Sequence, residues 1–267
     1  MKQEITDEII GFTRRFQEAH CTERFWRRPL ICFASAGDPM FMELKTAVSP
    51  SHAMPEDLLP GAQTVVAFFI PFDRSIIRSN IKGLHASHQW AEAYIQTNEL
   101  ISELGLHLGR CLESAGHTVA LIPATHNFDP ERLISDWSHR HVAFVAGLGS
   151  FGLNNMLITE SGCCGRIGSL VTSAFVEPDL RPTGEACLYC HDSSCMMCVE
   201  RCVNEALFTD RFYRQKCYAA CLKNEKLFQN LGKADVCGKC LVGVPCSFTN
   251  PVRRLKINNQ SALLMKR

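Results

Sequence analysis

Apolar residues form compact runs in the first two thirds of the chain. The runs at 29–35 and 64–72, PLICFAS and TVVAFFIPF, are rich in β-forming residues and almost free of polar ones. This pattern predicts two strands that are buried on both faces of a sheet. The segments 117–124 and 165–176, HTVALIPA and GRIGSLVTSAFV, predict two more strands.

Apolar residues with a helical period lie before and between these runs. Residues 90–116 give the strongest pattern, and Gly116 is placed to end that helix. Its apolar stripe comprises Ile101, Leu104, Leu108, Cys111 or Leu112, and Ala115. Residues 1–16 predict an amphipathic helix, and residues 129–146 predict a helix that opens with an Asp cap and a Pro. The alternation of strands and helices predicts a layered α/β domain.

Two prolines and a glycine at 177–186 predict a linker. Regular periodicity stops there and gives way to cysteine-led loops and short helices. We therefore expect an α/β domain at 1–180, a cysteine-led domain at 181–250 and a C-terminal tail at 251–267.

The charge balance does not indicate a nucleic-acid or membrane partner. The 267 residues include 28 Lys and Arg against 27 Asp and Glu, a net charge of +1. The longest apolar stretch, 65–70, is too short to cross a bilayer, and residues 1–16 lack the apolar region of a signal peptide. We expect a cytoplasmic protein with reduced cysteines, which favours metal ligation over disulfides.

Ten of the 15 cysteines lie between Cys187 and Cys246. The first group, CLYCHDSSCMMCVERCV, ends in a C-x2-C-x3-C run that matches the last three positions of the two-cluster ferredoxin pattern. The second group ends in CGKCLVGVPC. The pattern predicts two [4Fe–4S] clusters, and electron transfer as the role of this region.

A ferredoxin-style crossing divides these cysteines into two sets of four ligands. The first set comprises Cys187 or Cys190, with Cys195, Cys198 and Cys246. The second set comprises Cys202, Cys217, Cys237 and Cys240. Cys190 and Cys221 are spare cysteines that could replace a ligand. Structural zinc is the alternative, but a third thiolate one helical turn beyond a C-x2-C pair is unusual in a zinc ribbon.

The other cysteines carry weaker signals. Cys21, Cys32 and Cys111 stand alone in apolar patterns and are expected to pack as small buried side chains. Cys163 and Cys164 form a vicinal pair beside glycines, for which a redox role is the less favoured interpretation.

Residues 147–152, GLGSFG, match the G-x-G-x-x-G pattern of dinucleotide-binding loops. Such a loop should open a helix and be followed by an acidic residue about 20 positions later. Here the next segment stops at Gly162, and the acids near that distance lie in the predicted linker. Two interpretations remain, a glycine turn for close chain packing and a loop that lies against another cofactor.

The segment SDWSHRH at 135–141 carries the best polar group outside the cysteines. Asp136, His139 and His141 could donate a proton to a reduced substrate. On a helix, an ordinary salt bridge from Asp136 to His139 or Arg140 is the alternative.

The sequence HRHVAFVAGLGSFGLNNMLITESG, followed by GSLVTS and then by the cysteine groups, resembles the epoxyqueuosine reductase family over about residues 120–250. The resemblance implies a nitroreductase-like α/β domain that holds cobalamin, followed by a ferredoxin-like module with two [4Fe–4S] clusters. It places Gly147, Gly149 and Gly152 against the cofactor or substrate. It also implies a proton-donating aspartate shortly before this loop, for which Asp129 and Asp136 compete; Asp136 is our candidate.

We therefore expect an oxidoreductase that relays single electrons from a low-potential donor, of the ferredoxin or flavodoxin type, to a corrinoid or a small-molecule substrate. The known family reaction reduces epoxyqueuosine in transfer RNA, but members that act on transfer RNA are generally longer, with C-terminal helical repeats. That difference and the balanced charge make transfer RNA an unlikely substrate. The alternatives are an electron-transfer partner without its own substrate, a genuine epoxyqueuosine reductase and a zinc-stabilised binding module.

Overall fold

The computed structural model describes residues 1–21, 23–124, 127–255 and 257. Its chain forms two compact units. Unit 1 comprises residues 1–73, 93–148 and 165–181, and unit 2 comprises residues 74–92, 149–164 and 182–267. Our division into consecutive domains at 1–180, 181–250 and 251–267 stays a prediction.

Unit 1 is built around a four-stranded sheet in the order β1-β2-β6-β3. All three strand pairs are antiparallel, so the mixed α/β architecture that we expected is of the α+β kind. The strands are β1 (Leu30–Ser35), β2 (Thr64–Pro71), β3 (Val119–Leu121) and β6 (Gly165–Thr172). The helices are α1 (Lys2–His20), α2 (Met40–Ala47), α3 (Pro55–Leu58), α5 (His88–Ser114), whose first turn belongs to unit 2, and α6 (His139–Val145).

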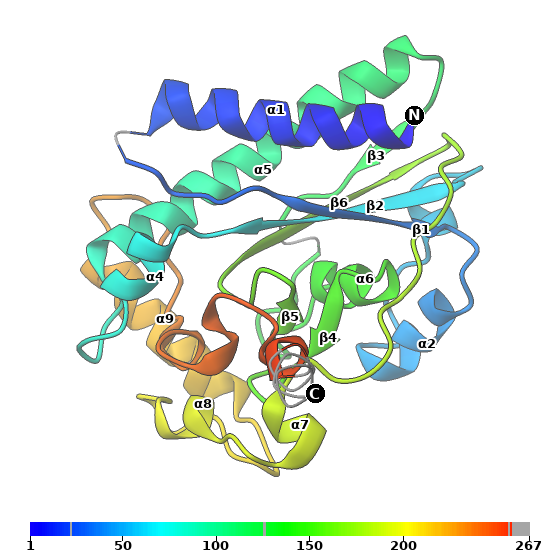
Figure 1. The fold of residues 1–267 in the computed structure, drawn as a ribbon. Coiled ribbons are helices and arrows are strands. Elements are labelled where there is room, and N and C mark those ends of the chain that lie inside the picture. The colour runs from blue at the N-terminus through cyan, green and yellow to red at the C-terminus, as the bar shows by residue number, and fades with distance from the viewer. Residues whose placement is uncertain (22, 125–126, 256, 258–267) are drawn as a thin grey trace, which may run out of the picture. The chain divides into compact units, whose positions relative to one another are not determined.

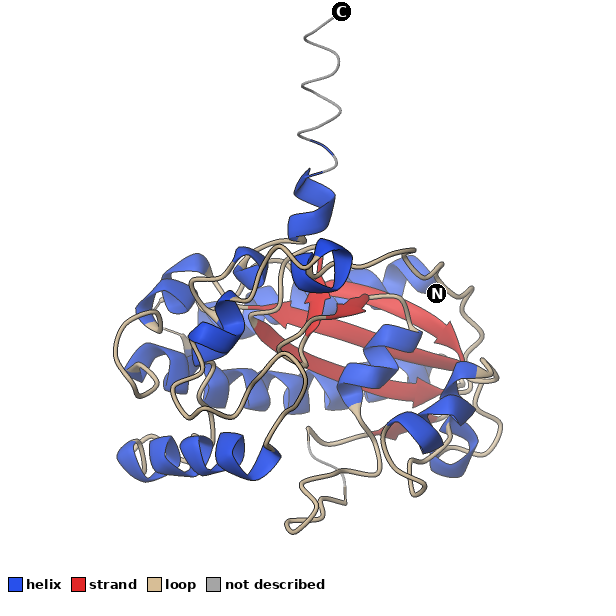
Figure 2. Cartoon of the chain, turned by 90° about the horizontal axis from the view of Figure 1, so that it is seen from below, coloured by secondary structure: helices blue, strands red, loops and turns tan. Residues whose placement is uncertain are grey.

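Strand β2 is the centre of this sheet. It pairs with β1 through Phe69 opposite Leu30, and with β6 through Val66 opposite Leu170. All eight of its residues are buried, as the apolar run at 64–72 predicted. Both faces are covered: α1 and α5 lie on one side, and α2 and α6 lie on the other (Figure 1). Figure 2 shows the strands of the larger sheet side by side.

The pleat of β6 shows how the two helical layers meet the sheet. A Cβ at Gly168 would lie 2.4 Å from the Phe68 ring of β2 and 3.0 Å from the Ile101 side chain of α5, so these two side chains fill its place on the α5 face. The next residue, Ser169, points to the other face and accepts a hydrogen bond from Trp137 Nε1 at 3.0 Å. Successive residues of a strand face opposite sides, so one strand contacts both layers.

The two long helices confirm their sequence patterns. On α1, Ile5, Ile9 and Phe16 are buried. On α5, Leu112 is buried and Cys111 is exposed, so Leu112 continues the apolar stripe. The expectation that Cys111 packs as a buried side chain was therefore wrong, because position 111 lies outside the 3.6-residue stripe. Gly116 has a φ of 85° and ends the helix in the left-handed conformation, as expected.

The helix predicted at 129–146 is shorter than its pattern suggested. It begins at His139, and the chain before it makes turns with an antiparallel bridge between Asp129 and Ile134. Asp129 Oδ1 accepts hydrogen bonds from the backbone N–H groups of Glu131 and Arg132, and Leu133 has a φ of 54°. The left-handed residue stops a helix from continuing through this turn.

Unit 2 consists of short elements joined by loops, as the loss of periodicity predicted. Its helices are α4 (Arg74–Ser79), α7 (Leu188–Asp192), α8 (Met197–Glu200) and α9 (Arg214–Leu227). It also contains the hairpin β4 (Gly149–Phe151) and β5 (Leu157–Thr159), and the 3-10 turns η1 (Lys239–Leu241) and η2 (Pro245–Ser247). Within the described part of the chain, no helix combines the length and apolarity needed to cross a membrane.

Candidate metal and redox centre

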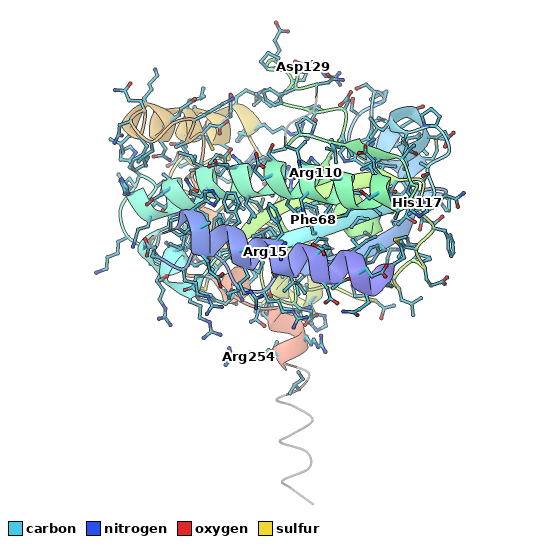
Figure 3. All side chains as sticks on the ribbon, turned by 90° about the horizontal axis from the view of Figure 1, so that it is seen from above. Arg15, Phe68, Arg110, His117, Asp129 and Arg254 are labelled. Atoms are coloured by element: carbon cyan, nitrogen blue, oxygen red, sulfur yellow. The ribbon has the colours of Figure 1, made fainter. Side chains whose placement is uncertain are left out.

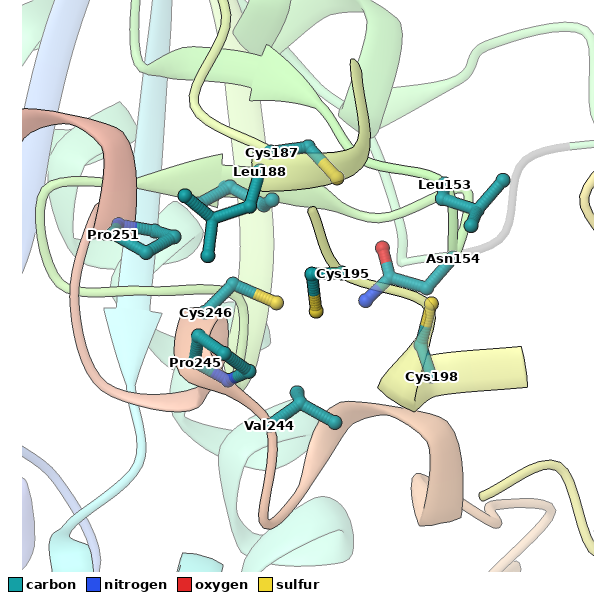
Figure 4. Close-up of a pocket in the computed structure, with 11 residues that line it drawn as sticks. Leu153, Asn154, Cys187, Leu188, Cys195, Cys198, Val244, Pro245, Cys246 and Pro251 are labelled. Atoms are coloured by element: carbon teal, nitrogen blue, oxygen red, sulfur yellow. The ribbon is translucent and has the colours of Figure 1, made fainter. Parts of the chain in front are cut away.

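Four cysteines of unit 2 line one cavity. These residues, called the first cysteine set, are Cys187, Cys195, Cys198 and Cys246. Short elements position two of them directly: Cys198 lies on α8 and Cys246 lies in η2, while Cys187 precedes the first residue of α7. Figure 4 shows their sulfur atoms around a shared space. Residues 59 positions apart in the sequence therefore meet at one site.

The walls of this cavity are mainly apolar. They include Leu153 and Ile158 from the β4–β5 hairpin and its turn, and Val244, Pro245 and Pro251 from the C-terminal segment. Asn154 is the non-cysteine polar residue of the lining. Such a wall restricts water, which strengthens electrostatic interactions with any charged group inside.

The thiols of the first set interact electrostatically. Burial, followed by the charges of the other three members, raises the pKa of Cys198 to about 12. The pKa of Cys246 is also raised, first by its hydrogen bond with Cys163 and then by burial. Four thiols that oppose one another's ionisation form a stable set of thiolates only with a cation between them.

The second cysteine set comprises Cys202, Cys217, Cys237 and Cys240. Burial, followed by the charges of the other three members and of Cys198, raises the pKa of Cys240 well above its ordinary value. Burial also raises the pKa of Cys237, and the charges of Cys217 and Cys202 add to this shift. The members of the second set therefore lie near one another in space. Cys240 also lies near enough to the first set for the charge of Cys198 to raise its pKa.

The two cysteines that we called spare lie beside these sets. Cys190 is exposed as a residue, but its thiol is partly covered by neighbouring atoms. This partial burial, followed by the charge of Cys187, raises the pKa of Cys190 to about 11. Cys187 lines the cavity and Cys190 does not belong to its lining. Cys221 lies one turn after Cys217 on α9, and a hydrogen bond with Cys217, followed by burial, raises its pKa. The choice of ligands within each pair stays a prediction.

Polar side chains far away in the sequence hold the Cys237 loop. Asn80 Nδ2 donates to the carbonyl of Cys237 at 2.9 Å, and Asn224 Nδ2 donates to the carbonyl of Val236 at 2.8 Å. Both asparagines are fully buried. Gly238 has a φ of 71°, and a Cβ there would lie 2.3 Å from the Trp90 ring. Only glycine fits this turn between two ligands of the second set.

Lys239 is buried inside the same loop, with 1% of its surface exposed. Its ammonium donates hydrogen bonds to the carbonyls of Asn80 and Lys82 at 2.9 and 2.7 Å. Arg201 donates to the carbonyls of Lys239 and Ile81 at 3.3 and 2.7 Å. The second set therefore has two cations in its surroundings. Sequence reasoning missed Asn80, Trp90, Asn224 and Lys239, because no local pattern records contacts between distant segments.

The vicinal cysteines lie against the first set. Both are buried, and the backbone N–H of Cys163 donates to the carbonyl of Cys246 at 2.9 Å. The Cys163 thiol is 3.9 Å from the Cys246 sulfur, and the Cys164 thiol donates to the carbonyl of Leu241 at 3.2 Å. At Gly162, φ is 82° and a Cβ would meet the Cys246 carbonyl at 2.7 Å. The turn that carries this pair thus packs on the loop of a predicted ligand.

The three glycines of the 147–152 loop each face other parts of the chain. A Cβ at Gly149 would lie 2.2 Å from the carbonyl oxygen of Ile158, across the β4–β5 pair. A Cβ at Gly152 would lie 2.8 Å from the Ile158 side chain, and one at Gly147, where φ is 90°, would lie 3.1 Å from the Leu180 carbonyl. Close chain packing therefore accounts for each glycine, and their role in binding a cofactor stays a prediction.

Asp136 lies in the turn segment before α6, in unit 1. Its Oδ2 accepts a hydrogen bond from Asn127 Nδ2 at 2.7 Å, and its carbonyl accepts one from Ala53 N at 2.8 Å. Since α6 begins at His139, the helical spacing that we assumed from Asp136 to His139 and Arg140 was wrong. The catalytic role of Asp136 stays a prediction.

A buried polar group that includes His139 lies close to Asp136 in the sequence. His139 Nε2 donates to the carbonyl of Pro123 at 2.9 Å, and its Nδ1 lies 2.8 Å from Ser169 Oγ. His52, which the sequence did not single out, is fully buried and stacks on Trp137. Burial lowers the pKa of His52, while its hydrogen bond to the Ala53 carbonyl and the charge of Asp136 oppose this shift. Unit 1 therefore holds two imidazoles whose ring orientations are fixed.

Comparison with known proteins gives a likeness of fold. No family model matches the sequence, and no curated protein matches it. The chain has the fold of the epoxyqueuosine reductases. One such structure, a selenomethionine-labelled enzyme, is 18% identical with a TM-score of 0.54, over 89% of this chain and 64% of the other. The resemblance stated from the sequence is thus confirmed at the level of the fold.

Three further epoxyqueuosine reductase structures agree. The one from Bacillus subtilis, whose aspartate-bearing catalytic loop is swung out of the active site, is 18% identical with a TM-score of 0.54. The one from Streptococcus thermophilus is 16% identical with a TM-score of 0.50. A third, with an epoxyqueuosine-modified transfer RNA stem loop, is 18% identical with a TM-score of 0.50. These cover 90% of this chain, which spans 64–66% of their length.

Proposed function

We propose that the protein is an iron–sulfur oxidoreductase of the epoxyqueuosine reductase type, which relays single electrons through two [4Fe–4S] clusters to a corrinoid or a substrate. One observation carries the proposal: the four cysteines expected to bind the first cluster line a single cavity. The fold shared with epoxyqueuosine reductases supports the same conclusion. Neither observation depends on the other.

The spacing of the sulfur atoms favours a cluster over zinc. A tetrahedral zinc site, with bonds of about 2.3 Å, would place its four sulfurs about 3.8 Å apart. Neither cysteine set, all eight members of which the structure describes, has three sulfurs within 4.8 Å of one another. A cubane separates its thiolates more widely, because four irons and four sulfides lie between them. The cavity of the first set therefore suits the larger group.

The residues around each set have distinct tasks. When bound, the clusters would accept and donate one electron at a time. The apolar walls of the first set limit access of water. Lys239 and Arg201 place positive charge beside the second set, which would favour its reduced state. In this proposal electrons pass between the two sets, and the electrostatic effect of Cys198 on Cys240 supports their being near one another.

Metal and sulfide analysis after anaerobic reconstitution tests the proposal. We expect about eight irons and eight sulfides per chain, because each cubane holds four of each. About four irons would mean that one set binds no cluster. Zinc without sulfide would overturn the proposal and favour the zinc-stabilised module.

Cobalamin is the second part of the proposal. It is supported by the likeness of fold alone, so it needs a direct binding experiment. Titration of the iron-loaded protein with hydroxocobalamin, followed by its visible spectrum, should show saturable binding of one corrinoid per chain. Absence of binding by the iron-loaded protein would favour an electron-transfer partner, or direct delivery of electrons to a substrate.

Our expectation against transfer RNA gains no support from the comparisons, since one neighbour was solved with a transfer RNA stem loop. Epoxyqueuosine in transfer RNA is therefore kept as a second candidate substrate. The local basic residues are Arg253, Arg254, Lys256, Lys266 and Arg267, of which the last three lie outside the described residues. Arg253 pairs with Glu160 at 2.6 Å. A gel-shift titration at physiological salt decides: submicromolar, salt-sensitive binding would establish transfer RNA as a partner.

A further inference from the structure

Three side chains of different metal-binding types converge on the outer helices of unit 1. They are Glu8 of α1 and His107 and Cys111 of α5, and one ligand atom of each lies within 4.8 Å of the other two. Figures 1 and 3 show α1 and α5 running side by side over the same face of the sheet. Nothing in the proposed electron-transfer function uses these residues. The group is remote from the cysteine sets in sequence and belongs to unit 1 rather than unit 2.

The helix fixes two of the three donors on one face. His107 and Cys111 are four residues apart, so they lie one above the other on α5, at a spacing that many helical metal sites use. The Phe12 ring of α1 stacks on the His107 ring with centroids 4.8 Å apart. This contact orients the imidazole so that its Nε2 points at the other two donors.

The separation of the Cys111 sulfur from His107 is close to that of a zinc tetrahedron, and the separation of Glu8 from His107 is shorter. The Cys111 sulfur lies 3.7 Å from His107 Nε2. Zinc bonds of about 2.3 Å to sulfur and about 2.05 Å to nitrogen would place these atoms about 3.6 Å apart. Glu8 Oε2 lies 2.7 Å from the same nitrogen, where a zinc site needs about 3.4 Å. A small rotation of the half-exposed Glu8 carboxylate would lengthen the distance from its oxygen to His107 Nε2 to the value that zinc needs.

Hydrogen bonding serves His107 and Glu8 better than it serves Cys111. The hydrogen on His107 Nε2 lies between that nitrogen and Glu8 Oε2, which are 2.7 Å apart, whereas the Cys111 sulfur, 3.7 Å from the same nitrogen, makes only a weak contact. A divalent ion at the point of convergence would bind all three at once. A thiolate and a carboxylate would also neutralise its two positive charges.

We propose that Glu8, His107 and Cys111 form a binding site for a borderline divalent ion of the zinc type. Mixed nitrogen, sulfur and oxygen donors select such ions over magnesium or calcium, which prefer oxygen alone. The protein supplies three ligands, and water completes the tetrahedron. Arg15, whose guanidinium lies 3.7 Å from Glu8 Oε2, stays beside the carboxylate and orients it. The ion would link α1 to α5 across 99 residues of sequence.

Alkylation of Cys111 is the test, because this cysteine is exposed and its own peptide can be followed by mass spectrometry. The iron-loaded protein is treated anaerobically with iodoacetamide, with and without micromolar zinc chloride. We expect zinc to slow alkylation of the Cys111 peptide at least tenfold, EDTA to restore it, and magnesium to have no effect. Since the readout belongs to one peptide, zinc bound elsewhere does not disturb it.

Two ligand variants and one matched control complete the experiment. Glu8→Gln and His107→Ala should each remove the protection of Cys111 by zinc. Glu113→Gln, an exposed substitution on the same helix, should retain it. Unprotected Cys111 in the iron-loaded wild-type protein would overturn the proposal. Equal protection in wild type, Glu8→Gln and His107→Ala would also overturn it, because zinc would then bind the thiol alone.

Discussion

The core of unit 1 and the core of the C-terminal part of unit 2 are packed from different kinds of side chain. The core of unit 1 contains large side chains with under 2% exposure, among them Phe33, Phe41 and Trp137, packed on a regular sheet. From residue 182 onward, the buried apolar side chains of the described residues are alanines, cysteines, leucines, valines and one proline. Each large side chain buried contributes about 1.5–3 kcal/mol, so unit 1 has the stronger apolar contribution per residue.

Buried polar side chains anchor the loops of unit 2. Asn80, Asn224 and Lys239 are fully buried there. The two asparagines donate to backbone carbonyls of the Cys237 loop, and Lys239 of that loop donates to the carbonyls of Asn80 and Lys82. The cysteine sets add thiols that oppose one another's ionisation. The comparison teaches that hydrophobic burial can fold unit 1, whereas the cysteine loops of unit 2 rely more on hydrogen bonds to buried groups and, under the proposed function, on the clusters that they would bind.

The largest expected effect comes from removing a ligand of the first set. Cys198→Ala should lose about half of the iron, because a cubane with three protein thiolates is held weakly. Metal binding contributes to the folding of the loops around it, so hydrogen exchange should accelerate at 187–202 while the β2 and β6 amides remain protected. Cys32→Ala is the control and should retain all iron. Equal loss of protection in both units would contradict the view that the two units are stabilised by different interactions.

A core substitution in unit 1 should have the converse effect. Phe68 is 2% exposed on the central strand, and Phe68→Ala should destabilise unit 1 by about 3–5 kcal/mol through loss of buried surface and a cavity. Figure 3 marks its position beneath the helical layer. Urea unfolding followed by far-ultraviolet circular dichroism measures the effect, and iron content before the transition should stay unchanged. Iron loss at low urea would show that the units fold as one.

The buried ammonium of Lys239 tests how much polar contacts contribute to the stability of unit 2. Lys239→Met keeps the stem and removes the ammonium that serves one buried carbonyl, of Asn80, and one partly buried carbonyl, of Lys82. Leaving these carbonyls unpaired should cost about 2–4 kcal/mol. Hydrogen exchange at 237–246 reports the loss, and Lys223→Met, at an exposed position of α9, serves as the control. Unchanged protection in Lys239→Met would mean that polar anchoring contributes little.

The smallest expected effect is a pH dependence of unit 1. Burial lowers the pKa of His52 below its ordinary 6.5 in the folded state. The unfolded chain therefore binds the proton more readily, so stability is full above about pH 6.5 and falls as pH decreases from there. His52→Asn should reduce the slope of unfolding free energy against pH between 7 and 5, measured by urea titration with tryptophan fluorescence. His117→Asn should leave that slope unchanged, and equal slopes in all three proteins would contradict the assignment.

Much of the fold could be predicted from local patterns. The continuous apolar run at 64–72 predicts a buried strand, and the 3.6-residue apolar period at 90–116 predicts a helix. In the structure both elements lie within two residues of the expected bounds at each end. The pattern at 129–146 misled because the Asp129 cap stabilises a turn as readily as a helix. A positive φ at Leu133 has no signature in the sequence, so the start of α6 was missed.

The sequence by itself determined that ten cysteines gather in two groups with the spacing of metal ligands, since ligand spacing along a loop is a local property. The ferredoxin-type spacing also suggested that Cys246 joins the first group, but only the tertiary structure decided that Cys187 and not Cys190 lines the cavity, because this depends on how distant segments fold together. It also decided that Gly149 faces Ile158 and that Glu8 meets His107 and Cys111. Contacts of this kind depend on how elements pack, and one-dimensional periodicity carries no record of which faces meet.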